Sequence, residues 1–294
     1  MQKNRTIRPL YKALLILVVM CCAACQDEVE PIPAFVTVAP FTLTTDAAEE
    51  GYPSINLPDA WAYADSIFLG GFGINRPFPV LEEGITQLEI FPGFRDNGIK
   101  AAPDIYPFYT TVKVNVDLKP GEIDTIYPQI KYRSGLAFPL RDNFDFSTVM
   151  ESDLDSDPET KLELNQSEAI YGPSCGKITL SKDHSKVQVA CNFILSDLPT
   201  TGQAVYLELD YKTDVRFAVG VLGYIPSSGA QSIDVVYVNP KDNWNKIYVN
   251  LSEVLHLSQL DDYKIYLAAI YTGDAAVDEK QNIYVDNLKV VYFN

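Results

Sequence analysis

Side chains that could carry covalent or metal chemistry are few in this chain of 294 residues. Only 2 residues are His and 5 are Cys, whereas Asp and Glu together number 39. His184 lies in a short polar turn and His256 lies between two leucines, and neither has a Gly-x-Ser-x-Gly nucleophile motif nearby. The sequence contains neither a glycine-rich phosphate loop nor a metal-ligand spacing. Two carboxylates would suffice for a glycosidase, but without other catalytic motifs we predict that the chain is not an enzyme.

Beyond the first 25 residues the only cysteines are Cys175 and Cys191. They flank two strand-like segments, 176–181 and 186–190, that are joined by a turn around Asp183. A hairpin centred there places the two cysteines opposite each other, about 4.5–5.5 Å apart at Cα, which a disulfide tolerates. We therefore predict a disulfide that contributes roughly 3 kcal/mol. The alternative is two unrelated buried thiols, because a register shift of one residue separates them.

The first 24 residues have the pattern of an export signal. Four basic residues and no acidic one precede an uncharged, mostly apolar run at 13–24. This run is too short for a membrane span, which needs about 18 residues or more, but it fits a signal peptide. It ends in Cys22-Ala23-Ala24-Cys25, which resembles the lipobox of bacterial lipoproteins. The resemblance implies lipidation of Cys25, palmitate included; a signal that is simply cleaved is the alternative.

An acidic tether is expected at 25–34. Its stretch Gln26-Asp27-Glu28-Val29-Glu30 resembles the surface-export signal of Bacteroidota-type lipoproteins, which implies an outer-membrane protein at the cell surface. The alternative is a few charges on a disordered tether. The formal net charge of −16 argues against nucleic-acid binding, because little basic surface is available for phosphates. An acidic surface also repels anionic lipids. Membrane attachment is therefore expected to come from the lipid anchor alone.

The rest of the chain predicts an all-β fold in two parts. Short strand-like segments alternate with Gly, Pro and Asn turn signals, and the alternation of apolar residues is clearest at 112–118. We expect a small antiparallel β-sandwich at 35–135 and a β-jelly-roll sandwich at 142–294, with the boundary near 133–142. The second part should begin with a strand at 143–147. Its only helical candidate is the segment 252–258.

Two local patterns in the first part resemble known motifs. The segments 61–70, 79–84 and 88–90 resemble a PEGA-type module, a surface scaffold without known chemistry. Asp65-Ser66-Ile67 and Asp124-Thr125-Ile126 resemble the O-glycosylation acceptor of Bacteroidota-type exported proteins. The second resemblance implies modification of Ser66 and Thr125, although a pattern of three residues also occurs by chance.

The second part resembles the galactose-binding-like jelly rolls that occur as carbohydrate-binding modules. The segments that carry this resemblance are 205–212, 244–251 and 283–290, the last of which contains Val-Asp-Asn-Leu. It implies glycan binding and a structural calcium ion between the first and last strands, with Asp286 and Asp145 as ligands. The alternative for Asp286 is a turn cap or a carboxylate that faces solvent.

Aromatic rings are the expected floor of a glycan site, because the apolar face of a pyranose stacks on them. Tyr224, in a Gly- and Ser-containing loop, is the best candidate for an exposed platform, and Tyr211, Arg216 and Tyr237 are candidates to flank the same face. Trp244 is expected to pack under a loop. We therefore predict a non-catalytic, glycan-binding lipoprotein. The alternative is a structural or adhesion subunit of a cell-envelope assembly that binds a protein partner.

Overall fold

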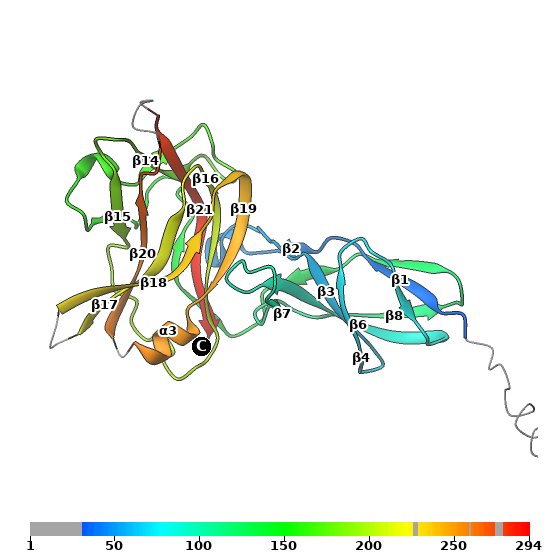
Figure 1. The fold of residues 1–294 in the computed structure, drawn as a ribbon. Helices are drawn as coiled ribbons and strands as arrows, with labels where there is room; N and C mark the ends of the chain where they lie inside the picture. The colour runs from blue at the N-terminus through cyan, green and yellow to red at the C-terminus, as the bar shows by residue number, and fades with distance from the viewer. Residues whose placement is uncertain (1–30, 226–228, 259, 274–278) are drawn as a thin grey trace, which may run out of the picture.

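The computed structural model describes residues 31–225, 229–258, 260–273 and 279–294. These residues form two β units that lie side by side (Figure 1), an N-terminal unit at 34–132 and a C-terminal unit at 136–293. The prediction of an all-β fold is confirmed. The predicted helix at 252–258 is also confirmed, as α3 (Ser252–Leu257).

The N-terminal unit is a sandwich of short sheets around its own hydrophobic cluster. In β3 (Asp59–Ala64) every second side chain is buried, so that alanines point inward while Trp61 and Tyr63 point outward. Pro128 cannot donate a ladder hydrogen bond, and it lies between two short strands, β9 (Ile123–Ile126) and β10 (Gln129–Lys131). One sheet orders β5 (Phe78–Val80), β1 (Ala34–Val38) and β9 (Ile123–Ile126), and β2 (Thr42–Thr44) pairs with β10 (Gln129–Lys131). The larger sheet orders β4 (Ile67–Gly73), β3 (Asp59–Ala64), β6 (Gly84–Arg95) and β7 (Pro103–Ile105), with β8 (Val112–Leu118) also paired to β6.

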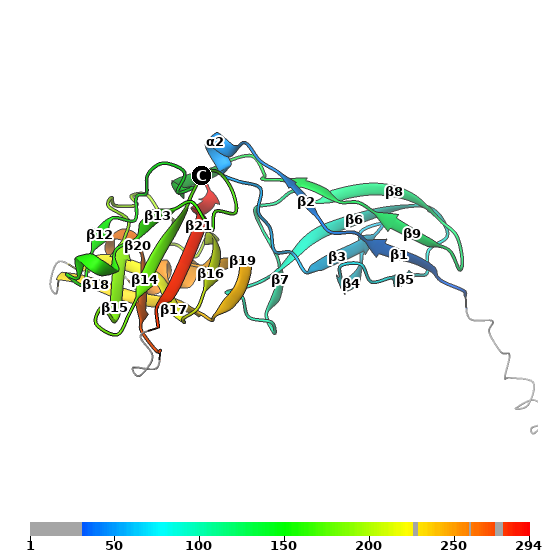
Figure 2. The same cartoon turned by 90° about the horizontal axis from the view of Figure 1, so that it is seen from above.

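The C-terminal unit consists of two packed sheets, which Figure 2 views from above. The interface sheet, named for its contact with the N-terminal unit, orders β13 (Glu163–Asn165), β14 (Cys175–Leu180), β21 (Gln281–Phe293), β16 (Val205–Thr213) and β19 (Lys241–Asn250), and β11 (Leu136–Asp142) also pairs with β21. The outer sheet orders β12 (Ser152–Asp153), β15 (Lys186–Ala190), β20 (Asp261–Ile270), β17 (Phe217–Ile225) and β18 (Gly229–Val238). The short helices are α2 (Ala47–Glu50) and α3, with a 3-10 turn at Pro158–Thr160.

Alternation along the strands fixes which side chains form the core between these two sheets. Leu207 and Leu209 of β16 point inward, as do Phe217 and Val219 of β17, and all four are almost fully buried. The intervening residues point outward, to the N-terminal unit from the interface sheet and to the surface from the outer sheet. The outward side chains of the outer sheet are therefore available to a ligand.

The predicted strand at 143–147 is wrong. The carboxylate of Asp142 accepts hydrogen bonds from the backbone N–H of Phe144 (3.0 Å) and of Val149 (2.8 Å), and Phe144 has a φ of 55°. These bonds fold the segment into a turn. The strand lies earlier in the chain, as β11 (Leu136–Asp142), within the residues where we expected the boundary between the two parts.

Buried charges lie between the two units. The carboxylate of Glu208 on β16 accepts hydrogen bonds from Tyr106 and Tyr132 of the N-terminal unit, at 2.6 and 2.9 Å. Burial raises the pKa of Glu208, but the ammonium groups of Lys246 and Lys289 outweigh burial and hold it below its usual value. The division into domains at 35–135 and 142–294 stays a prediction, because each unit contributes to this shared network.

Candidate functional site

A groove crosses the exposed face of the outer sheet. Its volume is about 300 Å³. Ala218 and Ala268 are cross-strand neighbours on β17 and β20, and their short side chains leave the face hollow there. One wall comes from β15, with Lys186 and Gln188, and the other comes from the end of β18. The residues that line this outer groove are Lys186, Val187, Gln188, Arg216, Ala218, Asp234, Tyr237, Ala268, Ala269, Ile270 and Thr272.

Arg216 and Tyr237 meet in the wall of the outer groove. The guanidinium carbon of Arg216 lies 4.3 Å from the centroid of the Tyr237 ring, and half of Tyr237 is exposed (50%). The hydroxyls of Tyr237 and of the buried Tyr266 both donate to the carboxylate of Asp234. The hydrogen bond to Asp234 raises the pKa of Tyr237. The wall therefore presents an aromatic ring, a cation and a carboxylate within one small area.

The structure places the predicted ligand-binding residues Tyr224 and Tyr211 in different surroundings. Tyr224 lies on β17 on the same face as Tyr237 and is 48% exposed, at the edge of the loop where we expected it. Tyr211, in contrast, points into the interior. It is 4% exposed and packs its ring against Phe217. Its ring belongs to the inner face of the opposite sheet, and Tyr211 nevertheless lines one cavity together with Arg216 and Tyr237. That Tyr211 flanks the same ligand-binding face stays a prediction.

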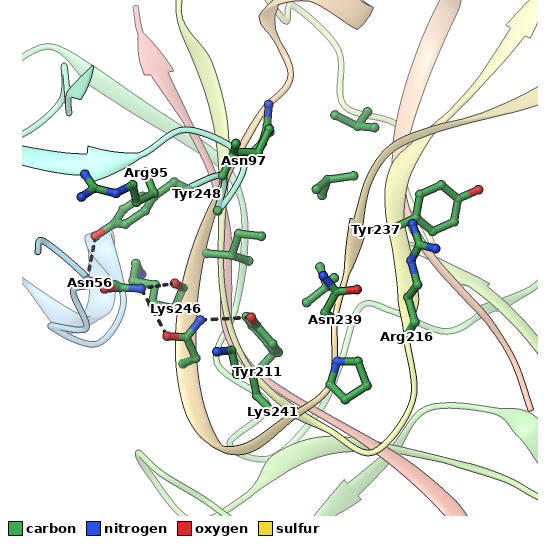
Figure 3. Close-up of a pocket in the computed structure, with 18 residues that line it drawn as sticks. Asn56, Arg95, Asn97, Tyr211, Arg216, Tyr237, Asn239, Lys241, Lys246 and Tyr248 are labelled. Carbon is green, nitrogen blue, oxygen red and sulfur yellow. Dashed lines mark hydrogen bonds between the residues drawn. The ribbon is translucent and has the colours of Figure 1, made fainter. Parts of the chain in front are cut away.

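A second and larger cavity, of about 700 Å³, lies between the two units. Figure 3 shows Arg95 and Asn97 of the N-terminal unit on one side of this inter-unit cleft and Arg216 and Tyr237 on the other. Arg216 and Tyr237 line both cavities, so the cleft and the outer groove meet at the end of β18. The hydroxyl of Tyr211 also reaches the cleft.

Amide side chains order one wall of the cleft. Asn56 of the N-terminal unit donates to Asn245 (3.2 Å), and Asn245 donates to the hydroxyl of Tyr211 (3.0 Å), as the dashed lines in Figure 3 trace. The backbone N–H of Asn56 donates to the hydroxyl of Tyr248 (3.2 Å). These bonds join the two units across the cleft and fix the positions of groups that can bind hydroxyls.

Sequence reasoning missed Asp234 and the whole inter-unit cleft. Asp234 and Tyr237 are three residues apart, so a strict period of two puts them on opposite faces of β18. A register shift beside Val219 and Gly220 brings both residues to the groove face. The alternation of side chains gives no sign of such a bulge. The cleft depends on loops from two units, and no local pattern relates them.

The predicted calcium ligands lie near each other but do not form a recognisable site. Asp286 is fully buried, its Oδ1 accepts the N–H of Asn287 (2.7 Å), and its Oδ2 has no hydrogen-bond partner among the described residues. Burial, followed by the charges of Asp210 and Asp145, raises the pKa of Asp286 to about 7. The carboxylate of Asp145 accepts the hydroxyl of Tyr52 at 3.1 Å.

Calcium needs about six to eight oxygen ligands. Among the residues that the structure describes, no group of three or more His, Cys, Asp or Glu side chains is placed to hold a metal ion. The unpartnered oxygen of Asp286 is one free donor, which falls short of a complete ligand set. Calcium at Asp286 and Asp145 therefore stays a prediction.

The predicted disulfide between Cys175 and Cys191 is wrong, and both residues are free, buried thiols. The strands next to them do not pair as a hairpin. β14 belongs to the interface sheet and β15 to the outer sheet, so the chain crosses the sandwich between them. Packed sheets lie about 10 Å apart, beyond the reach of a disulfide. Burial raises the pKa of the Cys175 thiol to about 12.

The predicted modification sites are accessible where the structure describes them. Ser66 is exposed in the turn between β3 and β4, and Thr125 is exposed on β9. Glycosylation of both residues stays a prediction. The predicted signal peptide at 1–24, Cys25 and most of the predicted tether lie outside the described residues. Within the described ranges, no helix has both the length and the apolar character needed to cross a membrane.

Comparisons with known proteins gave similarities of fold only. No family model matches the sequence, and no curated protein matches it. Similar solved structures include a xylan-binding domain of carbohydrate-binding module family 22 (14% identity, 53% of this chain and 95% of that chain, TM-score 0.38). Others are a family 30 module of a cellulosomal cellulase of Clostridium thermocellum (12%, 53% and 96%, 0.40) and a family 29 module (13%, 54% and 88%, 0.32).

Proposed function

We propose that the outer groove binds a glycan. The observation that carries this proposal is the meeting of the half-exposed Tyr237 ring with Arg216 and Asp234 beside a floor of alanines. A tyrosine ring offers an apolar surface to the C–H face of a pyranose. A guanidinium and a carboxylate offer strong hydrogen bonds to sugar hydroxyls. Such a mixture of apolar surface and a few fixed polar groups is typical of ligand sites.

On the same face of the outer sheet, Tyr224 lies farther along β17 than the groove. Ala218, which pairs with Tyr237, and Tyr224 are both on β17, six residues apart. A strand rises about 3.2–3.4 Å per residue, so this separation is roughly 20 Å. A ligand that contacts both tyrosines must therefore be several sugar rings long. We infer a polymer, and not a single sugar, as the ligand.

We infer that the groove captures a glycan without cleaving it. Asp234 is the only carboxylate among the described residues that line the outer groove. Hydrolysis of a glycosidic bond usually requires two carboxyl groups that flank it. Asp234 is also engaged by two tyrosine hydroxyls. The expected result of incubation with a bound glycan is no release of reducing ends.

Glycan-array binding followed by titration tests the proposal. Tyr237→Ala should weaken binding of the selected glycan about tenfold or more, the equivalent of about 1.4 kcal/mol. Tyr127→Ala is the matched control, because Tyr127 is 77% exposed and lies in the N-terminal unit away from the groove. Binding to no glycan, or equal binding by Tyr237→Ala and the parent chain, would overturn the proposal. That result would favour the alternative of an envelope subunit that binds a protein partner.

We also propose that the chain is an outer-membrane lipoprotein anchored through Cys25 and exposed at the cell surface. The basic start, the short apolar run and the lipobox-like Cys22-Ala23-Ala24-Cys25 support this location. β1 begins at the end of the N-terminal unit that lies away from the C-terminal unit (Figure 1), so the N-terminal unit would hold the groove off the membrane. Labelling cells with an alkyne analogue of palmitate should mark the parent chain and not Cys25→Ser. Protease treatment of intact cells would then tell whether the chain faces outward.

A further inference from the structure

The inter-unit cleft is lined by basic residues and by no acidic one. Eighteen residues line it, and its Lys and Arg members are Arg95, Arg216, Lys241 and Lys246. No Asp or Glu occurs among these described lining residues, although the chain has 39 acidic and 23 basic residues. A cleft lined by one sign of charge concentrates ligands of the opposite sign. The cleft therefore differs from the acidic surface of the rest of the protein.

Two of the four positive charges are already neutralised. Arg95 forms an ion pair with Asp59, and Lys246 lies 2.8 Å from the buried carboxylate of Glu208. Arg216 and Lys241 are exposed, and neither takes part in the ion pairs of the described residues. Arg216 is held in place by its contact with the Tyr237 ring. The cleft thus retains two positive charges without carboxylate partners.

The wall from the N-terminal unit is fixed before any ligand arrives. The side chain of Asn97 accepts the backbone N–H of Asn250 (2.8 Å), and the N–H of Asn97 donates to the carbonyl of Tyr248 (3.1 Å). Both bonds tie the loop after β6 onto β19. Asn97 and Gly98 have φ values of 53° and 69°, so the loop is a tight turn. A site held in this way loses little conformational entropy when it binds.

We propose that the inter-unit cleft binds an anionic segment of the glycan, through a carboxylate or a sulfate group that Arg216 and Lys241 recognise. This inference rests on the proposed function, because Arg216 and Tyr237 line both cavities and a chain in the groove can continue into the cleft. Arginine binds planar carboxylates with two parallel hydrogen bonds. The asparagine amides at the opposite wall are suited to the neutral hydroxyls. A volume of about 700 Å³ accommodates a short oligosaccharide.

The test compares a galacturonate hexamer with the same hexamer in fully methyl-esterified form, which keeps the ring and removes the charge. Calorimetric titration at about 10 mM salt should give at least tenfold tighter binding of the acid, and this preference should shrink toward 1 M salt, where screening is strong. Lys241→Gln should reduce the preference severalfold. Lys131→Gln is the matched control, since Lys131 is exposed on β10 in the N-terminal unit outside the cleft. A sulfated galactan hexamer is titrated as a third ligand and compared with the same neutral ester.

The outcomes separate the two proposals. Preference for the sulfated hexamer over the neutral ester, lost in Lys241→Gln, supports the anionic cleft and identifies sulfate as the group recognised. Equal binding of acid, sulfated and ester hexamers overturns the inference and leaves glycan binding in place. A preference that Lys241→Gln and Arg216→Gln both retain also overturns it, because the anion would then bind elsewhere. Binding of no glycan at all is the failure of the proposed function itself.

Discussion

The ammonium group of Lys246 lies 2.8 Å from the carboxylate of Glu208, and both side chains are almost completely removed from solvent. The pair lies on the face of the interface sheet that the N-terminal unit covers. Tyr106 and Tyr132 from that unit donate to the same carboxylate, at 2.6 and 2.9 Å. One buried charge is therefore satisfied by residues of both units, which makes their association part of the folded state.

Glu208→Ala should destabilise the protein strongly. The substitution leaves the buried Lys246 and Lys289 without their counter-charge and Tyr106 without its acceptor. Removing one partner of a buried ion pair typically costs about 3–5 kcal/mol. Urea unfolding measures the change. Glu122→Gln is the control, because Glu122 pairs with Lys119 at 4.0 Å on the surface, where both side chains are more than half exposed, and should change stability by less than about 0.5 kcal/mol. Equal effects of the two substitutions would contradict the importance of the buried network.

Lys289 should make stability depend on pH above neutrality. Burial, together with the nearby charge of Lys246, lowers the pKa of Lys289 to about 7, whereas an unfolded chain has a lysine pKa of about 10.4. Between these values the unfolded state binds more protons, so the contribution of Lys289 to stability rises with pH and is lost as pH falls through about 7. The free energy of unfolding of the parent relative to Lys289→Met should therefore be larger at pH 10 than at pH 7. A difference that stays constant between these pH values would refute the lowered pKa.

The all-β fold class and the helix α3 were predictable because both depend on local patterns. Alternating apolar residues mark strands wherever one face is at least partly buried, as in β8, and the helix at α3 has a short run without alternation. The pairing of the strands was harder to predict from the sequence. A strand, a tight turn and a second strand predict a hairpin, but the same sequence also fits a crossing from one sheet to the other, as between β14 and β15. Only the packing of the whole sandwich decides between the two.

The candidate site was predictable to a similar extent. Arg216 and Tyr237 were identified as candidates to flank one face, and the structure brings them into contact. Tyr211 lines the inter-unit cleft together with these two residues, but the burial of its ring depends on the sheet to which β16 belongs, which the sequence does not show. Asp234 was not predicted, because a β-bulge in β18 places it on the same face as Tyr237. The inter-unit cleft combines Asn97 with Arg216, and no pattern along the chain relates two such distant positions.

Cys175 and Cys191 should remain reduced in the folded protein. Burial raises the pKa of both thiols, which disfavours the reactive thiolate. Alkylation without reductant should therefore be slow in the folded protein and complete at both positions in concentrated urea, as peptide mass spectrometry would report. Recovery of a peptide that links Cys175 to Cys191 would contradict the placement of β14 and β15 in different sheets.

Calcium, if it binds at Asp286 and Asp145, should raise the melting temperature. An ion that binds only the folded state stabilises it by about 2.7 kcal/mol when present at 100 times its dissociation constant. The unpartnered Oδ2 of Asp286 is the donor available for it. Calcium should then raise the melting temperature of the parent at pH 8 and leave Asp286→Asn unchanged, whereas Asp117→Asn, an exposed control on β8, should respond like the parent. Melting curves that coincide in calcium and in chelator would rule this site out.

Gly220→Ala should weaken both stability and glycan binding, because Gly220 supports the wall of the outer groove from below. A Cβ at this position would lie 2.5 Å from the ring of Tyr266 and would also meet the carbonyl of Ile233. Tyr266 and Asp234 are the two residues opposite Gly220, and the hydroxyl of Tyr266 donates to Asp234. Insertion of a methyl group into such a packed site typically costs about 1–3 kcal/mol. The shift of Tyr266 should also move Asp234 and reduce the affinity for the glycan.

The matched substitution is Gly71→Ala in the N-terminal unit. Its Cβ would meet Trp61 at an ordinary 3.6 Å, so neither stability nor glycan binding should change appreciably. Thermal unfolding and glycan titration of the two variants separate the effects of fold and groove. A Gly220→Ala protein that keeps parental affinity while losing stability would mean that Asp234 takes no part in binding. The ligand would then be held by Tyr237 and Arg216 alone, and the carboxylate would serve only to anchor the two tyrosine hydroxyls.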